Sequence, residues 1–126
     1  MNPLAKTGAT IVVFALLSYT VAVAGEQRRR RLSPQTLAFL TVGVLLDVTA
    51  TVFMILGSSK GAFTLHGVLG YSSLAAMVID TVLIWRLARA SGPAAEVPRG
   101  LHRYTRVAYL WWVAAFITGG LLVAMR

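Results

Sequence analysis

Cysteine is absent from the 126 residues, so the sequence offers neither disulfides nor thiolate metal ligands. Charge is also scarce. Charged residues make up 13% of the chain, about half the share that soluble domains usually carry. Acidic residues are scarcer still, with four against twelve lysines and arginines. These scarcities argue against a disulfide-stabilised secreted domain and against an ordinary soluble one.

Hydrophobic residues, by contrast, reach 57% and gather in four long segments. Each segment has close to the ~20 residues that a helix needs to cross a bilayer. The predicted spans are 4–24, 35–56, 63–87 and 101–125. Ser33 and Pro34 suit the N-cap and the first turn of the second helix. We therefore expect one all-α domain over residues 1–126, an integral membrane up-down bundle of four transmembrane helices.

The basic residues fall in two clusters between apolar segments. One cluster is 28–31, and the other consists of Arg86, Arg89, Arg99, Arg103 and Arg106. The positive-inside rule places both clusters in the cytosol, which gives an N-out/C-out multi-pass protein of the cytoplasmic (inner) membrane. The bilayer is then the expected partner, and nucleic acid is not, because the charge flanks spans instead of forming a binding face.

The first apolar segment has a second interpretation, as a cleaved signal peptide. Ala22, Val23 and Ala24 before Gly25 resemble a signal-peptidase site. Cleavage there would leave four arginines near the start of a translocated chain, which the positive-inside rule disfavours. We expect a retained helix.

Ionisable residues inside a membrane are costly and mark candidate functional sites. Five stand out here: Asp47, His66, Asp80, His102 and Arg106. The topology puts His66 near the outer boundary and His102 at the inner one, roughly a membrane thickness apart. The two histidines of one chain therefore cannot share a haem iron.

The two aspartates are expected to find partners within the bundle. Asp47 lies at the depth of Tyr71 and Ser73 and one turn from Thr51. It is interpreted as a carboxyl group held by hydroxyl hydrogen bonds, as a proton-relay or substrate group, or as part of a water-filled cavity. Asp80 lies at the depth of Arg106, and we expect these two residues to form an ion pair.

Glycine near the first histidine leaves two interpretations open. Gly70 follows His66 by one turn, which gives room for a flat ligand or for close helix packing. His102 is either an interfacial residue or a ligand. Trp111 and Trp112 either pack the core or line a cofactor pocket.

Several short motifs together resemble those of the HsmA family of small four-helix membrane proteins, over nearly the whole chain. The residues that carry the resemblance are Tyr19, Glu26, Phe39, Gly43, Asp47, Thr51, Met54, the run 63–67, Gly70, Met77, the run 101–104, Trp111, Trp112 and Gly119.

The resemblance implies a b-type haem held by histidines, and a role in haem sensing and protection against haem or oxidative stress. The histidines that match are His66 and His102, which would be haem-iron ligands. It also implies a further histidine late in the third helix, where this chain has Asp80. Together with Arg106, that change suggests a haem site altered into a salt bridge.

Two other functions remain open from the residues alone. One is a non-catalytic accessory subunit of a larger membrane complex, or a homodimer. The other is a small proton-coupled transporter that uses Asp47 or Asp80. An enzyme is not expected, because the sequence has no phosphate-binding loop, metal-binding His/Glu pair or nucleophile–base arrangement.

Overall fold

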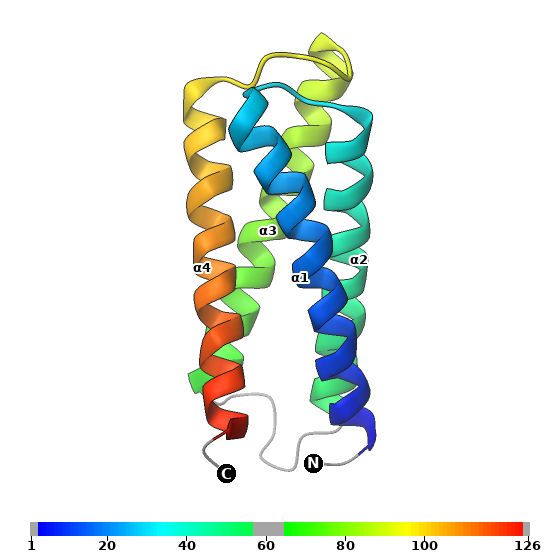
Figure 1. Cartoon of the computed structure of the whole chain (residues 1–126), viewed down its shortest axis with the longest axis vertical. Coiled ribbons are helices and arrows are strands. Elements are labelled where there is room, and N and C mark those ends of the chain that lie inside the picture. Colours follow the sequence, from blue (N-terminus) through cyan, green and yellow to red (C-terminus); the bar gives the residue numbers. More distant parts are fainter. Residues whose placement is uncertain (1–2, 57–64, 125–126) are drawn as a thin grey trace.

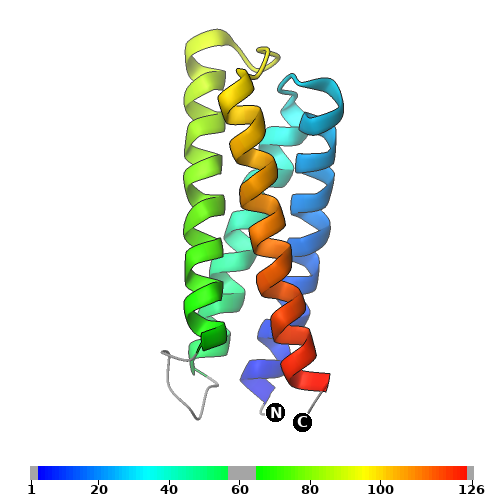
Figure 2. The same cartoon turned by 90° about the vertical axis from the view of Figure 1, so that its left-hand side faces the viewer.

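The fold is an antiparallel bundle of four helices, seen in a computed structural model that describes residues 3–56 and 65–124 (Figure 1). Within these ranges the side chains at positions 5, 65–67 and 120–124 are not described. The helices are α1 (Pro3–Arg29), α2 (Pro34–Leu56), α3 (Leu65–Ser91) and α4 (Arg99–Ala124). Consecutive helices pack against each other, and α1 closes the ring by packing on α4 (Figure 2). The predicted all-α up-down bundle is confirmed.

Three of the helices are long and apolar enough to cross a membrane: Lys6–Arg29, Pro34–Leu56 and Val68–Ser91. Large apolar side chains face outward along them, among them Phe14, Leu45 and Ile79. Asp47 and Asp80, in contrast, are buried. Ionisable residues of membrane-spanning bundles face the interior in the same way.

α1 is longer than the predicted span 4–24 and runs through the first two arginines. Arginine is a good helix former and nothing before Arg30 stops the helix. Arg30 adopts a left-handed conformation with φ 55°, and its N–H donates to the Glu26 carbonyl at 2.7 Å. This is a common way for a helix to end. The extension matters because it carries Glu26 and Gln27 alongside α4.

α2 begins as the sequence predicts. The Ser33 hydroxyl accepts a hydrogen bond from the Thr36 N–H at 3.1 Å, so Ser33 is the N-cap and Pro34 fills the first turn. α3 ends at Ser91, and Gly92 follows with φ 96°. Its N–H donates to the Ala88 carbonyl at 2.9 Å, and only glycine adopts such a φ without strain.

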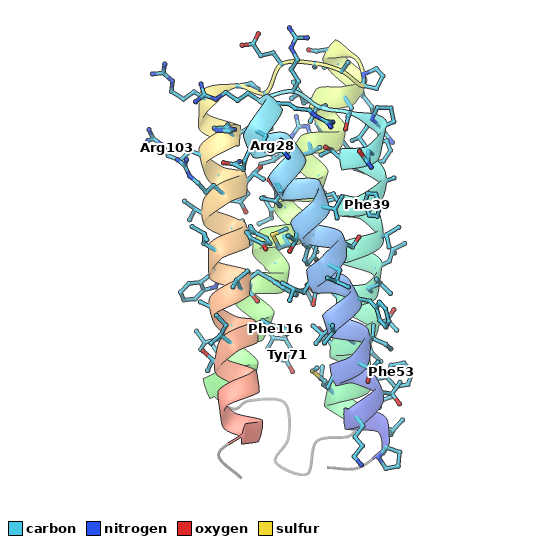
Figure 3. All side chains as sticks on the ribbon, viewed as in Figure 1. Arg28, Phe39, Phe53, Tyr71, Arg103 and Phe116 are labelled. Atoms are coloured by element: carbon cyan, nitrogen blue, oxygen red, sulfur yellow. The ribbon has the colours of Figure 1, made fainter. Side chains whose placement is uncertain are left out.

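The two arginine-rich loops lie at the same end of the bundle and bind each other (Figure 1). Leu32 N–H donates to the Ala95 carbonyl and Val97 N–H to the Arg30 carbonyl, both at 2.8 Å. The Leu32 and Val97 side chains are buried beneath this link. Arg28 and Arg103 mark the same end in Figure 3, and the start of α1 and the end of α4 lie at the other end.

Candidate functional site

Two polar clusters occupy the bundle interior. The first, near the arginine-rich loops, consists of Glu26, Gln27 and His102 and is called the loop-end cluster here. The second, further into the bundle, consists of Tyr19, Asp47 and Trp112 and is called the Asp47 cluster. Each joins helices that are not neighbours along the chain.

In the loop-end cluster a buried carboxylate holds a histidine. His102 Nδ1 lies 2.7 Å from Glu26 Oε2. The Glu26 side chain is 1% exposed and that of His102 is 13% exposed. Gln27 Nε2 donates to Glu26 Oε1 at 2.6 Å and to the His102 carbonyl at 3.0 Å. Both carboxylate oxygens therefore have partners, and the imidazole is fixed from one side.

The second ring nitrogen of His102, Nε2, remains available. It has no hydrogen-bond partner among the described residues. Among the described residues, Asp80 Oδ2 is the one side-chain nitrogen or oxygen that is buried without a hydrogen-bond partner. His102 Nε2 also lacks a partner, so it must be accessible at the protein surface. A carboxylate on Nδ1 favours the tautomer whose Nε2 lone pair is free. Metal-binding histidines are commonly held in this way.

His102 lines a half-open cleft of about 470 Å³ beneath the linked loops. The other lining residues are Arg30, Glu96, Val97, Pro98 and Arg99. This volume falls within the ~300–1,000 Å³ typical of small-molecule pockets. Its two guanidinium groups are suited to carboxylates or phosphates, which they can bind bidentately. The cleft could hold an anionic ligand against the imidazole.

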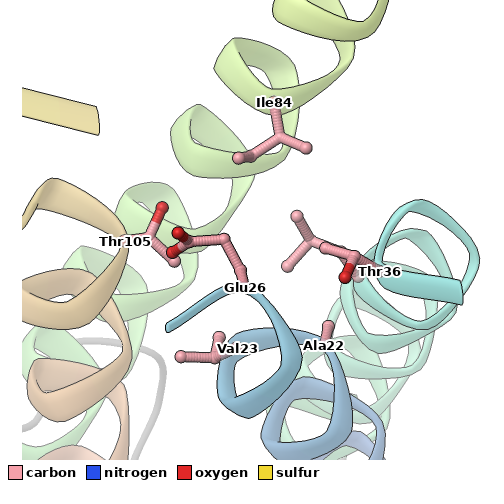
Figure 4. A pocket seen from close by; sticks show the side chains of 7 residues that line it. Ala22, Val23, Glu26, Thr36, Ile84 and Thr105 are labelled. Atoms are coloured by element: carbon pink, nitrogen blue, oxygen red, sulfur yellow. The ribbon is translucent and has the colours of Figure 1, made fainter. Parts of the chain in front are cut away.

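A second, much narrower gap lies deeper in the bundle, among α1, α2, α3 and α4. It is lined by Glu26, Thr36, Ile84 and Thr105, with Ala22, Val23 and Leu40 (Figure 4). This gap has no room for a water molecule. The lining of the loop-end cleft includes one imidazole and two arginines, which is the set of groups that a haem and its propionates would need, whereas the narrow gap has no room for such a ligand.

The Asp47 cluster binds three helices together. Asp47 Oδ2 accepts hydrogen bonds from the Tyr19 hydroxyl on α1 at 2.9 Å and from Trp112 Nε1 on α4 at 2.8 Å. The Tyr19 and Trp112 rings meet edge to face with centroids 5.0 Å apart. Trp112 also stacks on Phe116, at 5.8 Å. Of the two tryptophans that the sequence suggested for the core or a cofactor pocket, Trp112 packs in the core and Trp111 is exposed.

Asp47 accepts a hydroxyl hydrogen bond as predicted, but the donor is not one of the predicted residues. Thr51 donates to the backbone carbonyl of Asp47, and Ser73 donates to the carbonyl of Gly70. Both hydroxyls bond a backbone carbonyl one turn earlier in their own helix. Such local bonds compete with side-chain contacts between helices. Tyr71 is half-buried and does not bond the carboxylate. The donors come instead from α1 and α4.

The predicted ion pair between Asp80 and Arg106 is also wrong. Asp80 is fully buried and its Oδ1 accepts a hydrogen bond of 2.5 Å from the Thr105 hydroxyl. Arg106, the next residue along α4, is exposed. Consecutive helical residues point about 100° apart, so Thr105 and Arg106 cannot both face Asp80.

His66 lies at the end of the bundle opposite His102, because α3 and α4 start from opposite ends (Figure 1). The separation of the two histidines follows the prediction, although the His66 side chain is outside the described ones. A Cβ placed on Gly70 would meet no atom of the described residues within 4 Å, so the described packing does not require a glycine here.

Sequence reasoning gave no role at the site to Glu26, Gln27 or Thr105. Glu26 could have been found, because it is one of only two glutamates and lies two residues before the arginine cluster, at the end of an apolar segment. No protein-family model, no curated protein and no solved structure matches this chain.

Proposed function

We propose that the chain is an integral membrane protein with four spans, its arginine-rich end in the cytosol and both termini outside. Three helices have the required length and hydropathy. Support for α4 as the fourth span comes from its outward apolar side chains, such as Val107, Leu110 and Ile117. The gathering of both arginine clusters at one end of the bundle agrees with the positive-inside rule.

We further propose that the protein binds a b-type haem in the loop-end cleft, with His102 as axial ligand. The observation that carries this proposal is the 2.7 Å contact between His102 Nδ1 and buried Glu26, which leaves Nε2 without a described partner on a residue that lines the cleft. Arg30 and Arg99 line that cleft and would bind the two propionates. Resemblance to the HsmA family supports the same ligand class.

The chain's own residues would then set the properties of the site. Glu26 would orient the imidazole, and Gln27 holds Glu26 in place. Haem supplies an iron that an imidazole binds well. Asp80 has no part in ligation, since it is fully buried and does not line the cleft. The site is therefore a single-histidine one, altered from the pattern that the resemblance implies, and its role is to hold haem at the inner face without turnover.

An absorption titration tests this proposal. The purified full-length protein, supplemented with haem, is expected to develop a Soret band that saturates at one haem per chain. His102→Ala is expected to lose that band. His66→Ala, which changes the same residue type at the other end of the bundle, is the control and should retain it. Absence of a saturable band in the unmodified protein would refute haem binding.

A further inference from the structure

Asp80 is an ionisable side chain that the bundle encloses completely. Its exposed fraction is 0%. One carboxyl oxygen, Oδ1, accepts a hydrogen bond from Thr105. The other, Oδ2, has no hydrogen-bond partner among the described residues. The ligand and cofactor chemistry described above makes no use of this group.

No cation faces Asp80 from any element of the described bundle. The titratable groups close enough to act on it electrostatically are Glu26 and Tyr19 from α1 and Tyr104 from α4, and none of them is basic. The sole titratable residue of α2 is Asp47, which is bound to Tyr19 and Trp112. The basic residues nearest in sequence, Arg86 on α3 and Arg106 on α4, are exposed.

An ionised carboxylate in this position would be a buried charge with a single hydrogen bond and an acidic neighbour. Burial of an unpaired charge is so costly that the group changes its protonation state instead. A hydroxyl on Oδ2 without an acceptor costs much less than a charge there. The contacts therefore favour the neutral acid, with Oδ1 as the carbonyl oxygen that Thr105 binds.

We propose that Asp80 is a proton-binding site of the bundle, held as a neutral carboxylic acid with its proton on Oδ2 and positioned by the Thr105 hydroxyl. Thr105 also lines the narrow gap into which Glu26 points (Figure 4). Since Asp80 is fully enclosed and the neighbouring gap has no room for water, exchange of the proton requires the helices to open locally. The site therefore stores a proton instead of passing it freely, and it does so whether or not haem is bound.

The composition of the chain makes this proposal easy to test. Asp47 and Asp80 are its only aspartates, so Asp80 is the sole aspartate of an Asp47→Asn variant. The asparagine side chain of this variant keeps a carbonyl acceptor for the Tyr19 and Trp112 donors, and we expect the variant to fold. It is prepared with aspartate labelled with ¹³C at the side-chain carboxyl. Infrared spectra at neutral pH are then compared with those of the unlabelled variant.

The expected result is an isotope-shifted C=O stretching band of an un-ionised carboxylic acid, which responds slowly to transfer into D₂O. Adding Thr105→Val should move the band to higher frequency, because its carbonyl loses a hydrogen bond. An isotope shift confined to carboxylate bands would overturn the proposal. A band that Thr105→Val leaves unmoved would overturn the positioning role of Thr105. Should Asp47→Asn not fold, the infrared difference spectrum between the unmodified protein and Asp80→Asn decides between the same outcomes.

Discussion

Trp112 Nε1 donates to Asp47 Oδ2 across the diagonal of the bundle, from α4 to α2, over 2.8 Å. Tyr19 reaches the same oxygen from α1. Through these two hydrogen bonds, the carboxyl group of Asp47 connects α2 to α1 and to α4. In the proposed membrane setting, where lipid would provide no hydrophobic drive for association, such bonds would help to fix the arrangement of the helices.

Replacement of Asp47 by alanine is expected to destabilise the bundle by roughly 1–3 kcal/mol, because two buried donors lose their acceptor. The measurement is the free energy of unfolding in mixed micelles. Thr49→Ala on the same helix is the control, since Thr49 is exposed and bonds only its own backbone. Equal stability of the two variants would show that the Asp47 cluster contributes nothing.

Gly43 permits the close approach of α2 to α1. A Cβ at this position would lie 2.5 Å from the Tyr19 ring, which is itself fully buried. Gly43→Ala should therefore cost about 1–3 kcal/mol, the usual penalty for overpacking. Gly70→Ala meets no described atom within 4 Å and should be neutral or slightly stabilising. Thermal unfolding of both variants in detergent makes the comparison, and a tolerated Gly43→Ala would contradict the described packing.

Glu26→Gln tests the support of the proposed axial ligand. Loss of the carboxylate is expected to weaken haem binding by roughly 10–100-fold, as with other partners of metal-binding histidines. Haem titration of the purified variant gives the affinity. Glu96→Gln makes the same chemical change at an exposed position that lines the cleft, and it should not weaken binding. A similar loss in both variants would mean that Glu26 acts only through overall charge.

Orientation in the membrane is tested with single cysteines, which a chain without native cysteine accepts without background. Arg29→Cys and Ala94→Cys lie at the arginine-rich end, both exposed. Both should react with a membrane-impermeant thiol reagent only after cells are opened. Lys6→Cys, exposed near the start of α1, should react in intact cells. The reverse pattern would place the arginine clusters outside and remove the proposed topology.

Much of the fold was predictable because span length, charge placement and helix caps are local signals. Ser33 and Pro34 marked the start of α2, and the paired arginine clusters indicated that their loops share one end. The predicted first span ends at residue 24, before the charged residues, whereas α1 continues to Arg29. A helix, however, continues beyond a hydrophobic segment when its residues favour helix.

The interior contacts were harder to predict, since depth along the membrane does not fix the direction in which a side chain points. Asp80 and Arg106 were matched by depth, but Thr105, one residue earlier, faces Asp80. Asp47 was matched with hydroxyls of similar depth, whereas its donors come from α1 and α4. Helix rotation is set by packing such as that of Tyr19 on Gly43, which no local pattern reveals.

Chemical rescue tests whether His102 Nε2 binds the iron of a haem in the loop-end cleft, as proposed. His102→Gly removes the imidazole and leaves a gap beside Glu26, which held its Nδ1. The variant with haem should lack the Soret band of the unmodified protein and regain it when free imidazole is added. A His102→Gly variant whose haem spectrum equals that of the unmodified protein without imidazole would contradict the claim.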